Sequence, residues 1–157
     1  MHKKNNDVGD VIGVYRGGIS VDDRGKTSFV NDFDFKDVKR FYYIQNHKSP
    51  FIRAWHGHKR ETKYITVVKG SAVIGVVKID DWDTPTVMVN YEGVKKMVLS
   101  SENPTVVRVP PGCANGVMTL TDDTIVMVFS TSTLTDSLSD DFRFDARLWD
   151  IWNIEER

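Results

Sequence analysis

Two histidines one residue apart are the side chains of this sequence best suited to chemistry. His56 and His58 lie in a stretch of β-forming residues, with Arg53 before them and Lys59 and Lys63 after them. On an extended strand, side chains two residues apart point to the same face, so both imidazoles would line one surface. Neutral imidazole is a competent base near pH 7 and a common metal ligand. The pair indicates a proton-transfer or metal site, although an isolated pair at this spacing also fits two structural histidines.

Most of the chain around this pair has the pattern of short β-strands separated by turns. Runs of β-branched and aromatic residues alternate with Gly, Pro and Asp. The expected strands lie at 11–15, 27–31, 38–46, 52–58, 62–69, 71–79, 86–91, 95–99, 105–109, 116–120 and 124–130. Strands at such short intervals indicate an all-β sandwich or barrel, not alternating βα units. The segment from Leu134 is polar as far as Asp141 and then aromatic, so we expect it to pack back on the body with one helical turn.

The size and charge of the chain limit the kinds of partner. With 157 residues, 40% of them hydrophobic and 27% charged, it is expected to form a single domain, 1–157, with a flexible N-terminus at 1–10. The net charge of −1 provides no field for nucleic acid or an anionic membrane. No apolar run reaches the roughly 18 residues of a transmembrane helix, and no signal peptide is recognised. Cys113 is the single cysteine, so no intrachain disulfide is possible, and we expect a cytoplasmic protein.

The histidine pair, Gly70 and the segment 110–116 together resemble the two-motif layout of the cupin superfamily, which implies a jelly-roll barrel. In the metal-binding form, a Glu follows the histidine pair and a third His follows the second motif. These positions hold Lys63 and Asn115 here, so two of four ligands are missing and one is replaced by a cation. Glu61 is close enough to substitute as a ligand, but the shortfall predicts no metal.

Further markers resemble the dTDP-4-dehydrorhamnose 3,5-epimerase family and the related nucleotide-sugar 3,4-ketoisomerases. They are Asp22-x-Arg24-Gly25, Phe41-Tyr-Tyr-Ile44, Ile52-Arg-Ala-Trp-His56, Lys63-Tyr-Ile65, Val109-Pro-Pro-Gly112 with Ala114-Asn-Gly116, and Phe142-Arg-Phe144. The resemblance implies an isomerase or epimerase that acts, without a cofactor, on a nucleotide-linked 4-keto-6-deoxy sugar in surface polysaccharide biosynthesis. It also implies a homodimer, which exposed edge strands would favour.

The resemblance assigns roles to three residues near the histidine pair. His56 matches the base that removes a proton beside the C4 ketone, Lys63 matches a cation near the enolate oxygen, and Arg53 matches a substrate-binding arginine. A cation aimed at an oxygen that gains charge stabilises the transition state more than the ground state, and it lowers the pKa of a nearby imidazole. Arg53 and His56 are three residues apart, so both face one site only if the strand has a bulge or bend between them.

Four further residues from these markers, Arg24, Tyr43, Asn115 and Arg143, are expected to bind the substrate. Arginine presents a fork of donors suited to diphosphate. Tyr43 could stack on a nucleotide base, as could Tyr42 and Trp55, and at least one of the two tyrosines is expected to be structural because one face of each strand is core.

Two acid–base groups of the epimerases have no match. Their Tyr acid follows the last barrel strand, but the segment 130–135 contains no Tyr, and Thr133, the nearest match, carries a far weaker acid. Their Asp that orients the catalytic His lies near the C-terminus, and this chain is expected to end before it. We therefore expect epimerisation at one carbon, or ketone migration, and not a double inversion.

Three other interpretations stay open. The ketoisomerase branch carries H-x-H-K, which His56-Gly-His58-Lys59 reproduces, and two imidazoles on one face suit proton transfer between adjacent carbons. His58 is then a second catalytic acid–base group, or a substrate contact. A sugar-nucleotide-binding cupin without activity is the alternative from another class. The missing Tyr and Asp favour it, whereas the joint presence of Arg53, His56 and Lys63 favours an enzyme. A metal-dependent cupin is the third interpretation.

Overall fold

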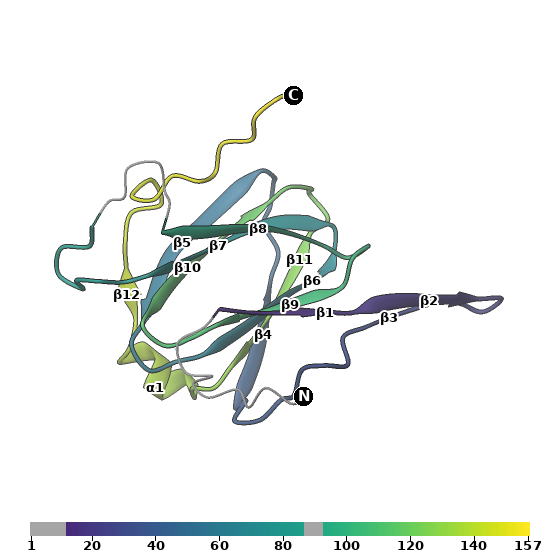
Figure 1. Cartoon of the computed structure of the whole chain (residues 1–157), viewed down its shortest axis with the longest axis horizontal. Helices are drawn as coiled ribbons and strands as arrows, with labels where there is room; N and C mark the ends of the chain where they lie inside the picture. Colours follow the sequence, from purple (N-terminus) through teal and green to yellow (C-terminus); the bar gives the residue numbers. More distant parts are fainter. Residues whose placement is uncertain (1–11, 87–92) are drawn as a thin grey trace, which may run out of the picture.

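Two antiparallel β-sheets face each other and enclose the interior of the protein (Figure 1). The computed structural model describes residues 12–86 and 93–157. One sheet has the strand order β1-β9-β6-β11-β4 and the other β12-β5-β10-β7-β8, while β2 and β3 pair with each other. The elements are β1 Gly13–Arg16, β2 Gly18–Asp22, β3 Gly25–Phe29, β4 Arg40–Ile44, β5 Phe51–His58, β6 Lys63–Lys69, β7 Ser71–Lys78, β8 Val94–Ser100, β9 Thr105–Val109, β10 Cys113–Thr119, β11 Ile125–Ser130, α1 Leu134–Leu138 and β12 Phe142–Arg143.

This arrangement confirms the predicted all-β class, a jelly roll with a short C-terminal segment. The prediction lacked β2, which forms because the turn at Asp22 brings Gly18–Asp22 back along β3, with Asp22 opposite Gly25. The helical turn occurs as α1, in the polar part of the C-terminal segment. The segment predicted to be flexible, 1–10, and all but the first residue of the strand predicted at 86–91 lie outside the described residues. That the chain forms one domain stays a prediction.

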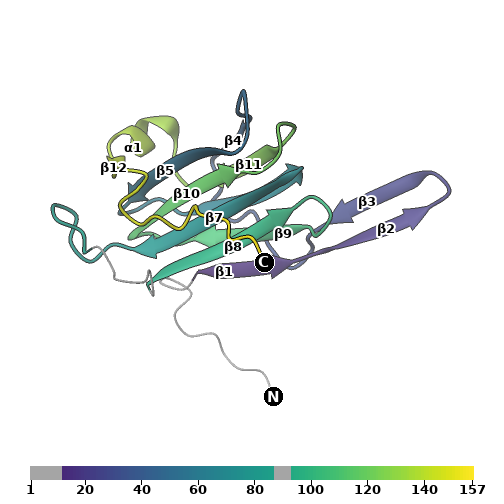
Figure 2. The ribbon, with the colours of Figure 1, turned by 90° about the horizontal axis from the view of Figure 1, so that it is seen from above.

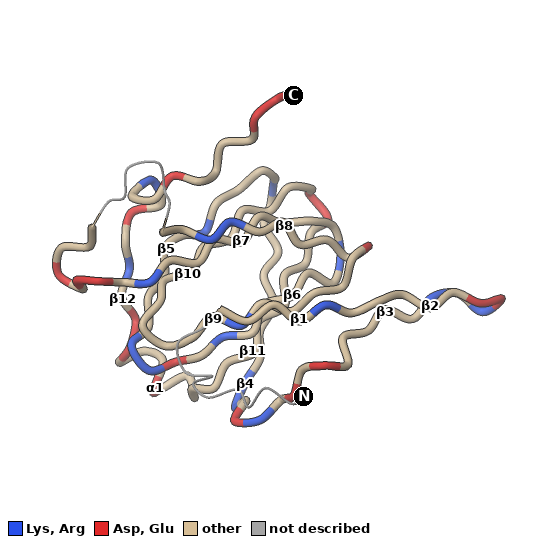
Figure 3. Tube along the Cα trace, in the orientation of Figure 1, with Lys and Arg blue, Asp and Glu red and all other residues tan. Residues whose placement is uncertain are grey.

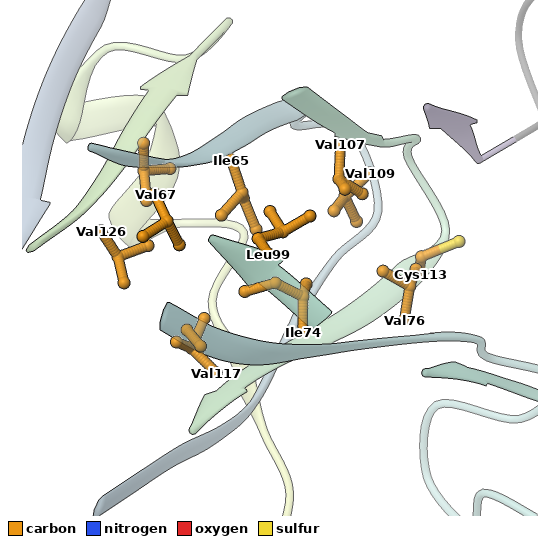
Figure 4. Packing of buried hydrophobic residues seen from close by; sticks show 12 residues of the cluster. Ile65, Val67, Ile74, Val76, Leu99, Val107, Val109, Cys113, Val117 and Val126 are labelled. Carbon is orange, nitrogen blue, oxygen red and sulfur yellow. The ribbon is translucent and has the colours of Figure 1, made fainter. Parts of the chain in front are cut away.

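Aliphatic side chains fill one part of the space between the sheets (Figure 4). Ile65 and Val107 from one sheet meet Ile74 and Val117 from the other, and each is at most 4% exposed. Alternation along β6 sends Lys63 to the same inner face as Ile65. The same strand therefore supplies both an apolar core residue and a buried cation.

The C-terminal segment covers the outer face of the second sheet, running across it in Figure 2 (yellow). Trp149 and Trp152 are 1% and 4% exposed, and their rings lie 5.5 and 5.1 Å from that of Trp55. Packing is so close that a Cβ on Gly116 would come within 2.8 Å of the Trp152 ring. The prediction that the aromatic segment packs back on the body is confirmed.

The hairpin of β2 and β3 projects from the body of the protein (Figures 1 and 2). Charged residues gather at its tip (Figure 3), where Arg24 binds Asp22 at 2.5 Å. The outer face of the first sheet carries large exposed apolar side chains, including Phe41 (62%), Tyr43 (61%) and Val68 (52%). None of the helices in the described part of the chain has the length and apolar character needed to cross a membrane.

Candidate functional site

A cavity of about 350 Å³ lies between the two sheets beside α1, next to the aliphatic core. Strands β4, β5, β6, β10 and β11 provide its walls, and α1 and β12 provide its rim. Leu134 and Leu138 of α1 line this rim and are both largely exposed. The cavity therefore has two exposed leucines at its rim.

Cations dominate the charged groups that line this cavity. Arg40, Arg53, Lys63 and Arg143 all face it, and Asp141 is the carboxylate among its lining residues. The whole chain carries a net charge of −1, so the positive charge is concentrated locally. Such a wall favours an anionic ligand, and guanidinium groups suit a diphosphate in particular.

A β-bulge brings Arg53 and His56 to the same side of β5. His56 pairs with Asn115 of β10, and Arg53 pairs with Val117, so the span between the pairs is one residue longer on β5 than on β10. The extra residue reverses the alternation, and both side chains line the cavity. The predicted bulge is confirmed. Arg53 is held there by donating from Nε to the Oδ1 atom of Asn46 at 2.7 Å.

His56 is held in its neutral form. Burial and, to a lesser extent, the positive charges of Lys63 and Arg143 lower the pKa of His56 to about 4. The imidazole makes no hydrogen bond with any residue that the structure describes. A neutral imidazole with an available lone pair, inside a cationic cavity, is suited to accept a proton.

Lys63, Asn115 and His58 present polar atoms that have no protein partner within the described chain. Lys63 is 7% exposed, and burial lowers its pKa. The buried Oδ1 of Asn115 and Nε2 of His58 have no hydrogen bond either. An unsatisfied buried polar group costs about 1–3 kcal/mol. All three residues line the cavity, and this cost would be recovered if a polar ligand bound there.

His58 differs from His56 because protein groups hold its ring. Its Nδ1 lies 2.6 Å from the carbonyl oxygen of Asp140 and 3.1 Å from Oε2 of Glu61. Asp140 in turn accepts hydrogen bonds through its carboxylate from the backbone N–H groups of Lys59, Arg60 and Glu61. The segment after α1 therefore fixes the turn between β5 and β6, and with it the orientation of His58.

Sequence reasoning missed Asp140 entirely and considered Glu61 only as a metal ligand. Glu61 is 1% exposed, and Asp140 is also 1% exposed. Nothing in the local sequence connects Asp140 to a turn about 80 residues earlier. A carboxylate that follows a histidine pair by three residues was the available signal for Glu61.

The other predicted site residues fall in different places. Arg143 lines the cavity, on β12 opposite His56. Tyr43 points to the outer face of β4, and its neighbour Tyr42 lines the cavity instead, where burial raises its pKa to about 12. Trp55 is fully buried beneath the C-terminal segment. Arg24 lies at the exposed hairpin tip, paired with Asp22, so the structure does not bring it into the cavity of its own chain.

The segment 130–135, in which we looked for a Tyr acid, runs from the end of β11 into the start of α1. Thr133 caps this helix by accepting a hydrogen bond from the backbone N–H of Asp136 at 3.2 Å. The next residue, Leu134, faces the cavity. Across residues 12–86 and 93–157, no three His, Cys, Asp or Glu side chains gather where they could hold a metal ion.

Comparisons with known proteins place this geometry in context. Residues 20–151 match the family model described as dTDP-4-dehydrorhamnose 3,5-epimerase. A search of curated proteins found no match. Among solved structures, the chain resembles dTDP-4-dehydrorhamnose 3,5-epimerase from Bacillus anthracis with TDP and PPi bound, at 23% identity and a TM-score of 0.72 over 92% of this chain and 86% of that one.

Two other solved structures represent related reactions. The QdtA 3,4-ketoisomerase from Thermoanaerobacterium thermosaccharolyticum, a double mutant in complex with TDP, is 18% identical with a TM-score of 0.63, over 88% of this chain and 91% of that one. The 3'-monoepimerase ChmJ from Streptomyces bikiniensis, in complex with dTDP-quinovose, is 17% identical with a TM-score of 0.70, over 94% of this chain and 74% of that one. At these identities the similarity shows a shared fold.

Proposed function

The chain belongs to the dTDP-4-dehydrorhamnose 3,5-epimerase family, and on this premise we propose that it removes and returns a proton beside the C4 ketone of a dTDP-linked 4-keto-6-deoxy sugar. The observation that carries the proposal is the convergence of neutral His56 and buried Lys63 on one cationic cavity. Relatives of the same fold are described with TDP or a dTDP-sugar bound. The expected pathway is surface polysaccharide biosynthesis.

The proposed chemistry needs a base and a cation at opposite ends of the forming enolate. His56 accepts the proton from the carbon beside the ketone, and the electron pair of that C–H bond moves into the enolate. Lys63 stabilises the negative charge that develops on the C4 oxygen. Arg53 and Arg143 bind the diphosphate, and Asn115 accepts a hydrogen bond from a sugar hydroxyl. No cofactor is required, because the electrons stay within the substrate.

The proposal favours reaction at one carbon. Inversion requires that the proton return to the opposite face, and the segment 130–135, where the resemblance predicts a Tyr acid, contains no Tyr. Epimerisation at a single carbon, as by the 3'-monoepimerase ChmJ, fits one surviving base better than a double inversion does. A sugar-nucleotide-binding protein without activity is the second candidate, and the absence of Tyr in the segment 130–135 favours it.

Migration of the ketone from C4 to C3 is the alternative isomerase reaction. His58 lines the same cavity as His56, with its Nε2 atom unpartnered. A second imidazole beside the first provides a second proton-transfer group for an enediol. The relative QdtA, named as a 3,4-ketoisomerase, supports this alternative.

Proton NMR of the protein with dTDP-4-keto-6-deoxyglucose in D₂O tests the proposal. Deuterium incorporated at C3 or C5, and lost in His56→Ala, is the expected result. Signals of a 3-keto sugar would establish the ketoisomerase instead. Ligand line broadening without exchange or new signals would contradict the catalytic proposal and favour the binding protein.

We also propose that the protein is a homodimer. The outer face of the first sheet exposes Phe41, Tyr43 and Val68, and the projecting hairpin exposes Val21. Large contiguous apolar patches on a protein surface are typical of interaction sites. Light scattering after gel filtration should give twice the chain mass of 17.9 kDa. Phe41→Glu should reduce the mass to that of one chain, whereas Glu102→Gln, a change at another exposed residue, should leave it unchanged. A single chain mass for the unmodified protein would contradict the proposal.

A further inference from the structure

Glu61 is a buried carboxylate that the proposed proton abstraction by His56 leaves unused. Its side chain is fully buried. Four groups surround its oxygens: the hydroxyl of Ser130, the hydroxyl of Ser137 at 3.0 Å, Arg40 Nη2 at 3.4 Å, and His58 Nδ1 at 3.1 Å. Burial of a carboxylate costs several kcal/mol unless charge and hydrogen bonds compensate it. These donors come from β4, β5, β11 and α1, so Glu61 is fixed from several sides.

The contacts of His58 determine which ring nitrogen carries the proton. The carbonyl oxygen of Asp140, 2.6 Å from Nδ1, can only accept, so Nδ1 must donate. Oε2 of Glu61 is a second acceptor for the same N–H. In the neutral ring, the lone pair is therefore on Nε2. That atom is buried without a partner, in a residue that lines the cavity.

We propose that Glu61 is a positioning residue that holds His58 with Nε2 as a proton acceptor for the bound sugar. This inference rests on the proposed function. A substrate X–H bond breaks, an N–H bond forms at Nε2, and the electron pair stays on the substrate. Glu61 keeps its charge and stabilises the imidazolium until the proton returns. His56, by contrast, has no orienting hydrogen bond within the described chain.

Some groups near His58 lower its pKa and others raise it, and Glu61 is one of those that raise it. Burial and Lys63 lower the pKa of His58, whereas Glu61 and the backbone and carboxylate of Asp140 raise it. His56 and His58 also repel each other when protonated. Removal of the Glu61 charge should therefore lower the pKa of His58 further, without moving the ring away from Asp140.

Glu61→Gln is the direct test, because it keeps the size of the side chain and one acceptor oxygen and removes the charge. We expect kcat to fall by at least about 100-fold, with KM changed by less than about threefold, as for loss of a group that acts on the transition state. The acidic limb of the pH profile of kcat should move to lower pH. Glu102→Gln, the same change at an exposed residue paired with Lys26, is the matched control and should change neither kcat nor its pH profile.

Nitrogen-15 NMR of the imidazoles gives a readout that does not depend on activity. The unmodified protein should show His58 as the Nδ1–H tautomer, identified by loss of its signals in His58→Asn, and Glu61→Gln should lower its pKa. If Glu61→Gln does not fold, Ser137→Ala, which removes one donor to Glu61, should lower kcat more moderately. An Nε2–H tautomer, or Glu61→Gln with unchanged kcat and His58 pKa, would overturn the proposal.

The same spectra separate this inference from the proposed function. If the protein turns over no nucleotide sugar, yet His58 has the Nδ1–H tautomer and its pKa falls in Glu61→Gln, the positioning by Glu61 is supported and the proposed reaction is wrong. If exchange at the sugar depends on His56 but not on Glu61, the proposed reaction stands and the role of Glu61 is wrong.

Discussion

The two parts of the space between the sheets differ in what fills them. In the aliphatic core, Val107 and Ile74 are fully buried among other hydrophobic side chains. In the cavity beside α1, Asn115 and His58 leave buried polar atoms without protein partners, and Lys63 is buried beside them. Both parts are built by the same strands, since Lys63 and Ile65 lie two residues apart on β6 and face inward. The core stabilises the fold, whereas the unpaired polar atoms of the cavity destabilise it and are available to bind a ligand.

The largest expected effect on stability comes from the core. Ile74→Ala removes buried methyl and methylene groups and leaves a void, so the free energy of unfolding should fall by about 2–5 kcal/mol. Urea denaturation measures this change. Deuterium exchange into the sugar, measured per folded molecule, should be nearly unaffected. A loss of exchange as large as that of a cavity variant would break the distinction between the two parts.

Lys63→Met is the matched change in the cavity, with a side chain of similar length and no charge. If Lys63 stabilises the enolate, the exchange rate should fall by about 100- to 1,000-fold, as for loss of one preorganised group at a developing charge. The free energy of unfolding should stay the same or rise, because a desolvated ammonium is removed. Exchange is followed by NMR and stability by urea denaturation. A strongly destabilised but active variant would reverse our interpretation.

Gly116→Ala should affect both parts, because Gly116 lies opposite the bulge on β5. An added Cβ would lie 2.6 Å from that of Ala54 and 2.8 Å from the Trp152 ring. We expect a loss of about 1–3 kcal/mol in the free energy of unfolding, typical of overpacking. Because Gly116 lies opposite the extra residue of the bulge, Arg53 and His56 should also shift, and KM should rise. Gly112→Ala, where a Cβ meets nothing within 4 Å, has a positive φ of 84° and serves to measure backbone strain alone.

Another expected effect is the pH dependence of stability that His56 contributes. Its pKa in the folded protein is about 4, below the ordinary value of 6.5, so the unfolded chain binds more protons between these values. The free energy of unfolding should therefore fall as the pH decreases from about 6.5 to about 4, and this contribution should be fully present above 6.5. Thermal unfolding at several pH values should show a shallower dependence for His56→Asn. An equal slope in both proteins would contradict the burial of a neutral His56.

The strands could largely be predicted from the sequence, because β-forming runs and turn residues act locally. Which of two adjacent strand residues faces inward could not. Tyr42 and Tyr43 have equal propensity for a strand, and a shift of one residue exchanges which of them faces the cavity. Tyr42 lies inside and Tyr43 outside. Trp55 has the same ambiguity, and the bulge turns it toward the C-terminal segment.

By itself, the sequence determined the all-β class, the shared face of His56 and His58, and the need for a bulge after Arg53, since each follows from the geometry of an extended chain. Only the tertiary structure decided that Asp140 holds the turn at 59–61 and that Glu61 is buried against His58. These contacts join segments far apart in the sequence. Their partners are selected by the packing of α1 against the sheets, and local sequence carries no record of that packing.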